Sequence, residues 1–144
     1  MGEPLTKPVA SQRTVRRLVK KYADLMGFAH PMRIGVAFYD SRKKQYIDPD
    51  DPACYGAAHV MPQYMRAVLC FDLYHEGWAL RDESIDECIR HELGHALVAL
   101  FAQAASHLVK EKDQQTPHIL ADLEDQLVQV IASMPVWAYV EGDE

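Results

Sequence analysis

The sequence predicts an α+β fold, with an N-terminal helix, a small three-stranded mixed sheet, a long central helix and one further helix. Two observations lead to this prediction. Apolar residues recur at helical spacing in three segments, and three short runs between the first two segments contain residues that favour strands. The chain has 144 residues, of which 49% are hydrophobic, and this suits a single domain with a substantial core. We expect residues 1–10 to form a flexible leader and residues 11–144 to form that domain.

The first half of the chain is expected to supply one helix and the sheet. The helix is expected over residues 11–26, where apolar positions repeat at helical spacing and Gly27 provides a stop. The polar run 40–51 is expected to be a loop, and a turn is expected over 75–82 with Gly77 as its flexible point. The three strands are expected at residues 32–39, 55–60 and 66–74, the last being the best suited to a buried position.

The second half is expected to contain two long helices. Ser84 and Glu87 form a capping box that starts a helix over about residues 85–109. The last helix is expected over 116–134, opened by a Thr-Pro pair and ended by a proline. Residues 136–140 are expected to be a short strand or an extended tail. The central helix has an apolar stripe made of Ile85, Ile89, Leu93, Ala96, Leu97 and Leu100.

Composition argues against several classes of protein. The formal net charge of −6 argues against a general nucleic-acid binder. The five basic residues between positions 13 and 21 are expected to form the solvated face of the first helix. We see neither a secretory signal nor a stretch apolar enough to span a membrane, so we expect a cytoplasmic protein. The cysteines at positions 54, 70 and 88 lack C-x-x-C spacing and are interpreted as reduced, buried thiols.

The most specific feature is an H-E-x-x-H motif, His91-Glu92-Leu93-Gly94-His95, inside the central helix. Two histidines four residues apart lie one turn above each other, with side chains that start about 5–6 Å apart. This gap suits one zinc ion held by both imidazoles at about 2.0–2.1 Å. Glu92 lies beside that face, where it could accept a proton from a water that the metal activates. We predict one Zn²⁺ ion held by His91 and His95, with Glu92 as general base; the alternative is a helix with two solvated or core histidines.

A catalytic zinc site needs a third protein ligand. Glu124 is the strongest candidate because it lies on the apolar stripe of the last helix, where a buried carboxylate is costly without a partner. Asp125 and His118 are alternatives, and Glu124 could instead pair with an arginine or extend to the rim. Cys88 shares the face of the two histidines, but it is nearly two turns, roughly 10 Å, from His95. We therefore interpret Cys88 as a core thiol.

The run from about Met32 to Met134 resembles the small zincin metallopeptidases, on the gluzincin side. It is similar to the single-domain minigluzincins and to the compact peptidases often carried by phages and prophages, including the ImmA/IrrE and SprT-like types. The shared pattern is a helix, a short sheet, the H-E-x-x-H helix and a glutamate on the next helix, here Glu124. Metzincins are less similar, because Val98 and Phe101 stand where their longer motif has Gly and His. The cysteine motif of peptide deformylases is also missing.

This resemblance implies a zincin-like fold and a zinc-dependent metalloendopeptidase that hydrolyses a peptide or protein substrate. In zincins the strand that lines the cleft pairs with extended substrate. The resemblance points to the strand formed by Gly56, Ala57, Ala58 and His59 for this role, and an ordinary edge strand is the alternative.

Two features of the implied enzyme are left open by the sequence. The residue that would stabilise the oxyanion is not singled out among Tyr55, Tyr64, His59 and Tyr139. The alternative function is a catalytically silent or self-blocked zinc-binding protein that uses the zincin shell for regulation or protein interaction. In that case the tail around Trp137 could cover the cleft.

Overall fold

The computed structural model describes residues 2–26, 33–61, 64–109, 125 and 128. This part of the chain is α+β, with a small three-stranded mixed sheet, as predicted. The elements in chain order are α1 (Gln12–Leu25), β1 (Arg33–Tyr39), the 3₁₀ turn η1 (Ser41–Lys43), β2 (Gly56–Met61), β3 (Arg66–Asp72), α2 (Gly77–Leu80) and α3 (Ile85–Val109).

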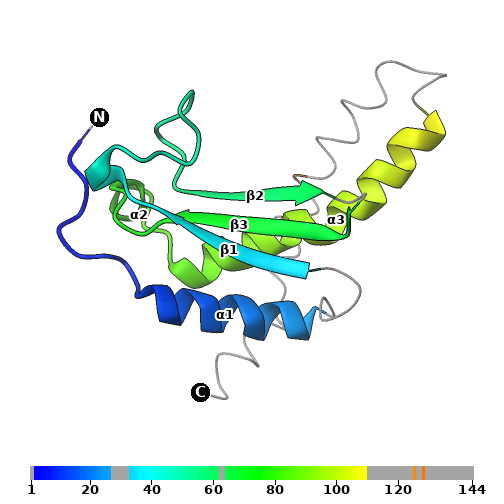
Figure 1. Cartoon of the computed structure of the whole chain (residues 1–144), viewed down its shortest axis with the longest axis horizontal. Helices are drawn as coiled ribbons and strands as arrows, with labels where there is room; N and C mark the ends of the chain where they lie inside the picture. Colours follow the sequence, from blue (N-terminus) through cyan, green and yellow to red (C-terminus); the bar gives the residue numbers. More distant parts are fainter. Residues whose placement is uncertain (1, 27–32, 62–63, 110–124, 126–127, 129–144) are drawn as a thin grey trace.

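The sheet has the strand order β1-β3-β2, with β3 in the centre. β1 runs parallel to β3, with Arg33 opposite Arg66, and β2 runs antiparallel to β3, with Gly56 opposite Phe71. The central strand is the most buried of the three, which agrees with its sequence of Ala, Val, Leu, Cys and Phe. Helices α1 and α3 lie on the same side of the sheet, with α3 packed against β2 and β3 (Figure 1). Within the described residues, β2 therefore has one edge unpaired.

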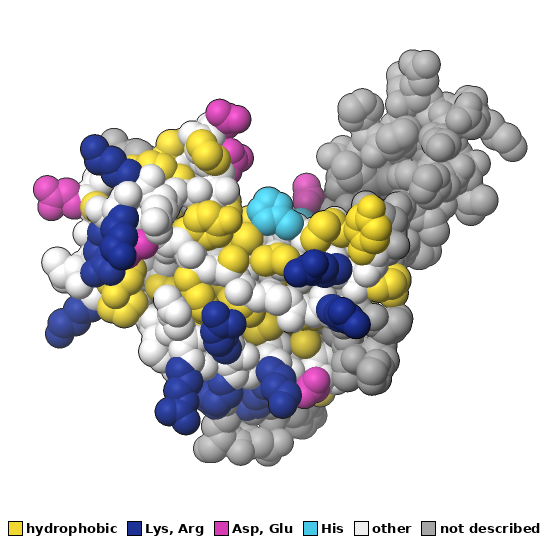
Figure 2. All heavy atoms as spheres, in the orientation of Figure 1, with side chains coloured by type: hydrophobic (Ala, Val, Ile, Leu, Met, Phe, Trp, Pro, Cys, Tyr) yellow, Lys and Arg dark blue, Asp and Glu magenta, His cyan; other side chains and the backbone are white. Residues whose placement is uncertain are grey.

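Helix α1 is capped by Ser11, whose hydroxyl accepts a hydrogen bond of 3.1 Å from the amide of Thr14. One face is buried in the core, and the Tyr22 hydroxyl at its end donates to Asp86 of α3 at 2.9 Å. Leu25, the last residue of the helix, is 44% exposed and does not join that face. The basic residues are on the outside of α1, as predicted, and Figure 2 shows Lys and Arg side chains gathered over this helix.

Helix α3 begins with the predicted cap, because the Ser84 hydroxyl accepts a hydrogen bond of 3.2 Å from the amide of Glu87. Ile89, Leu93 and Ala96 of its apolar stripe are fully buried, whereas Leu97 is 38% exposed. In the described part of the chain, no helix has the length and hydropathy needed to cross a membrane.

The turn expected over 75–82 contains the short helix α2. Trp78 at its centre is buried, and its indole nitrogen donates to the Asp72 carbonyl at 2.7 Å. The His75 ring accepts a hydrogen bond from the amide of Gly77 at 2.9 Å. These tertiary contacts fold the segment inward, against the end of β3.

The ends of the chain are described to different extents. Before α1, the amides of Leu5 and Val9 donate to the carbonyls of Tyr74 and Leu73 at 2.7 and 3.0 Å. The helix expected over 116–134 falls outside the described residues except for Asp125 and Val128, both of which are helical.

Candidate metal centre

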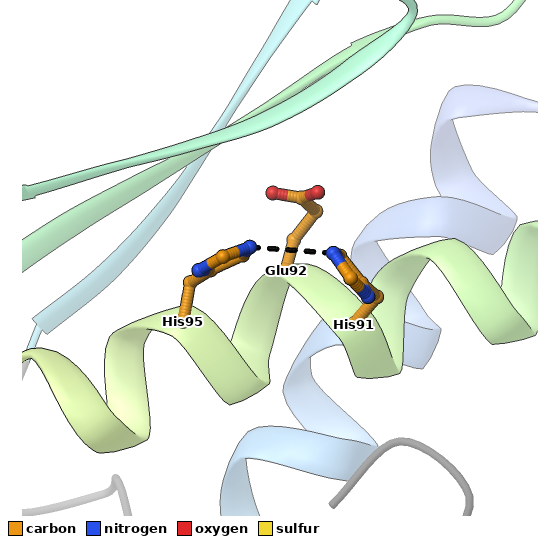
Figure 3. Close-up of side chains that lie close together, drawn as sticks. All are labelled: His91, Glu92 and His95. Carbon is orange, nitrogen blue, oxygen red and sulfur yellow. Dashed lines mark hydrogen bonds between the residues drawn. The ribbon is translucent and has the colours of Figure 1, made fainter. Parts of the chain in front are cut away.

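The two motif histidines converge on one point beside α3. The Nε2 atoms of His91 and His95 are 3.2 Å apart, and their rings meet edge to face with centroids 4.9 Å apart (Figure 3). Two nitrogens bound to one tetrahedral zinc at 2.0–2.1 Å would be about 3.3–3.4 Å apart. The observed separation is therefore close to the one that a shared zinc ion requires.

Glu92 completes the candidate metal group, which consists of His91, Glu92 and His95. One ligand atom from each of His91, Glu92 and His95 lies within 4.8 Å of the others, and Figure 3 shows the three side chains projecting from the same stretch of α3. Glu92 is only 7% exposed. Burial, together with a smaller effect of the nearby charge of Glu83, raises the pKa of Glu92 to about 7. A buried carboxylate of this kind is stabilised by a proton or by a bound cation.

The two central residues of the motif hold α3 in place. Leu93 is fully buried in the core beneath the sheet. Gly94 lies against Val128, because a Cβ atom at residue 94 would be 3.1 Å from the Val128 Cγ1 and 3.4 Å from its carbonyl oxygen. Val128, which follows α3 in the chain, therefore packs against the motif at Gly94.

The predicted third ligand is not among the residues that can be placed. Glu124 and the alternative His118 lie outside the described residues. Asp125, the other alternative, is described and exposed to solvent.

Two cavities meet at the candidate site. A cavity of about 730 Å³ lies at the start of α3 and reaches His91 and Glu92. A second cavity, of about 480 Å³, reaches Glu92, His95 and Ala99 farther along the helix. Both are lined by Gly56 and Glu92. Together they form a cleft between β2 and α3, with Glu92 where the two parts join.

Three of the four residues predicted to bind substrate lie beside the metal group. Gly56, Ala57 and Ala58 line the second cavity, together with Val60. Side chains of consecutive strand residues point to opposite faces of a sheet. Because Gly56, Ala57 and Ala58 all line the second cavity, this cavity lies along the backbone edge of β2. His59 is exposed and lines neither cavity.

The candidates for an oxyanion-stabilising residue differ in their surroundings. Tyr55 is buried beside the larger cavity and its hydroxyl donates a hydrogen bond to Glu83. Tyr64 is 72% exposed and His59 is exposed. Tyr139 lies outside the described residues.

Sequence reasoning missed several residues of the larger cavity, among them Cys54, Arg81 and Glu83. A signal for Glu83 was present, because it directly precedes the cap of the motif helix at Ser84. A side chain at that position lies near the start of the helix. The partner of Glu83, by contrast, comes from a loop 28 residues earlier.

All three cysteines are free thiols. Cys70 and Cys88 are buried, as predicted, whereas Cys54 is only half-buried. Burial raises the pKa of all three thiols. Cys88 packs directly under β2, since a Cβ atom at Gly56 would lie 2.6 Å from its sulfur. Its role as a core thiol is therefore confirmed.

Comparison with known proteins gave no match to this chain among protein-family models, curated protein sequences or solved structures.

Proposed function

We propose that this chain is a zinc-dependent metallopeptidase, in which His91, His95 and Glu124 hold one Zn²⁺ ion and Glu92 is the general base. The observation that supports this most directly is the 3.2 Å separation of the two imidazole nitrogens next to a buried carboxylate. The donor set fits zinc, because imidazole nitrogen and carboxylate oxygen are among its usual ligands.

The chemistry follows from the roles of these side chains. Bound Zn²⁺ would polarise the carbonyl of a peptide bond and activate a water molecule for attack. Glu92 would accept the proton from that water on a carboxylate oxygen and deliver it to the nitrogen of the leaving amine. The two histidines would keep their rings facing the cleft, because the core contacts of Leu93 fix the rotation of α3.

An extended peptide is the substrate that suits the cleft. The unpaired edge of β2 runs past Gly56, Ala57 and Ala58, beside Glu92 and His95, and presents backbone donors and acceptors at alternate residues. A peptide could pair with this edge as an added strand, and the small side chains would allow its backbone to approach closely. This would hold a peptide bond over the metal group.

Glu124 as third ligand draws support from the contact between Val128 and Gly94. Glu124 precedes Val128 by four residues, a spacing that places two residues on one face of a helix. Asp125 is exposed, which argues against it as the ligand.

Metal content tests the ligand assignment. Wild-type protein incubated with zinc and then desalted should retain about one ion per chain by mass spectrometry of the native protein. His95→Ala should lose the ion and Glu124→Ala should bind it more weakly. His59→Ala is the matched control, because this exposed histidine lines neither cavity. Zinc retained in full by His95→Ala would refute the site.

Peptide cleavage tests the role of Glu92. The zinc-loaded wild type should cleave peptides from an unfolded protein, as read by mass spectrometry of the products. Glu92→Gln should keep its zinc and lose cleavage, by a factor of about 10² or more if proton transfer limits the rate. Zinc binding by a wild type that cleaves no peptide would favour the silent zinc-binding protein instead.

A further inference from the structure

We propose that the larger cavity is a subsite for a cationic side chain of the substrate, a lysine or an arginine next to the cleaved bond. This inference rests on the proposed peptidase function and adds a substrate class to it. The cavity has a volume of about 730 Å³ and opens onto the metal group through His91 and Glu92.

Carboxylates outnumber cations on the cavity wall. Four acidic side chains line it, from Asp51, Glu83, Glu87 and Glu92, against the two guanidinium groups of Arg81 and Arg90. Opposite charge in a site that is partly shielded from water attracts a ligand more strongly than it does on an open surface. The excess of negative charge therefore favours a positively charged group.

The two arginines are already engaged. The Arg81 guanidinium lies over the Tyr55 ring, 5.7 Å from its centroid. The Nε atom of Arg90 donates to the carbonyl of Asp86 at 3.3 Å, so its side chain is held along α3. These contacts engage both arginine side chains, while the cavity wall keeps its excess of carboxylates.

Glu83 is the carboxylate placed best to bind the substrate. It is half-buried, and the hydrogen bond from the Tyr55 hydroxyl fixes its position. Glu83 and Glu92 line the same cavity. A cation in the cavity would thus interact with Glu83 and with the metal group's own carboxylate.

Tyr55 gives the cavity wall an aromatic surface beside Glu83, and the buried residues Trp78 and His75 support its ring from behind. The Tyr55 ring packs against Trp78 with centroids 4.5 Å apart and against His75 at 5.5 Å. The His75 Nε2 atom is 2.7 Å from the carbonyl oxygen of Pro52, and this contact holds the loop that leads to Tyr55. Long cationic side chains bury their methylene groups on such surfaces and keep the charged head at the polar end.

The direction of β2 determines which substrate residue the cavity receives. The larger cavity is at the Gly56 end of β2 and the second cavity extends to Val60. A peptide added antiparallel to β2, the more stable pairing, would run from Val60 towards Gly56. The larger cavity would then receive a residue that follows the cleaved bond.

Substrate profiling tests this directly. Peptides that differ only in lysine, norleucine or glutamate after the cleaved bond are compared by kcat/KM with zinc-loaded protein. We expect lysine to exceed norleucine about tenfold, which corresponds to about 1.4 kcal/mol and to one charge-assisted contact. The preference should shrink at high salt, because screening weakens the attraction.

Charge-neutral variants identify the residues responsible. Glu83→Gln keeps the size of the side chain and should remove most of the lysine preference. Glu87→Gln, at an exposed position, is a second variant with little risk to folding. Asp50→Asn is the matched control: Asp50 is exposed in the same loop as Asp51 but does not line the cavity, so it should leave the preference unchanged. Equal kcat/KM for lysine and norleucine, or a glutamate preference, would overturn the proposal.

A binding measurement separates this proposal from the peptidase proposal. Fluorescence anisotropy with labelled peptides and the metal-free wild-type protein reports affinity without cleavage and leaves all four carboxylates in place. Tighter binding of the lysine peptide by about tenfold, with no cleavage by wild type, would support the subsite and refute the peptidase. Cleavage by wild type without any preference in binding or in kcat/KM would support the peptidase and refute the subsite.

Discussion

Replacement of Glu92 by Gln should change how the stability of the metal-free protein depends on pH. Glu92 is 7% exposed, and burial raises its pKa from an ordinary value of 4.5 to about 7. At a pH between these two values, the Glu92 carboxyl keeps its proton in the folded protein but has released it in the unfolded chain. Stability therefore falls as pH rises from about 4.5 to about 7, and the loss is complete above that range. The gap corresponds to about 3 kcal/mol, because one pH unit is about 1.4 kcal/mol.

The Gln side chain stays neutral, so the variant should lack this loss. Between pH 4 and pH 8, the free energy of unfolding of the variant should therefore rise by up to about 3 kcal/mol relative to that of the wild type. This is roughly 10 °C in melting temperature for a chain of this size. Thermal melts followed by circular dichroism, with a chelator present, would measure both proteins across this pH range. Parallel curves for the two proteins would refute the reasoning about Glu92.

Zinc provides an internal control for the same experiment. A divalent cation beside Glu92 favours its carboxylate form, and binding to the folded state alone adds stability. The loss of stability with rising pH should therefore shrink in zinc-loaded wild type. If it persists unchanged, the cation does not sit near Glu92.

Three further predictions concern packing around the motif helix, each measured as the free energy of unfolding in denaturant. Ser84→Ala should cost about 1 kcal/mol because it removes the helix cap, and Ser84→Asp should retain most of the stability. Gly94→Ala places a Cβ 3.1 Å from the Val128 Cγ1, so it should cost less in a Val128→Ala background than alone, with a coupling of about 0.5 kcal/mol or more. Gly56→Ala places a Cβ 2.6 Å from the Cys88 sulfur and should cost about 1–3 kcal/mol, partly recovered by Cys88→Ala. Additive effects in either pair would contradict the corresponding contact.

The sequence predicted the elements whose signals are local. The spacing of apolar residues placed α1 and α3, and the Ser84 cap fixed the start of α3 at the residue that the structure has. The composition of residues 66–74 indicated a buried strand, and β3 is the central strand. The motif also predicted that His91 and His95 share one face of α3, because that follows from helical geometry alone.

Features that depend on distant contacts could not be predicted in the same way. Helix α2 forms around Trp78, whose position depends on a hydrogen bond to the end of β3. The larger cavity depends on Tyr55 and Glu83, which are 28 residues apart and meet only after the sheet has formed. No periodicity in the sequence relates two such residues, and Gly77 favoured a flexible turn when read alone.

The residues of the H-E-x-x-H motif have two different tasks in α3, and together these tasks support the proposed metal site. His91 lines the larger cavity and His95 the second, while Leu93 is fully buried in the core and Gly94 lies against Val128. The four residues thus divide between proposed ligand positions and packing positions on about one helical turn. Because the imidazole nitrogens already lie 3.2 Å apart, zinc binding would need little change in their separation. A site organised in advance loses less binding energy to ordering its ligands. The packing residues therefore contribute to the proposed metal affinity without touching the metal.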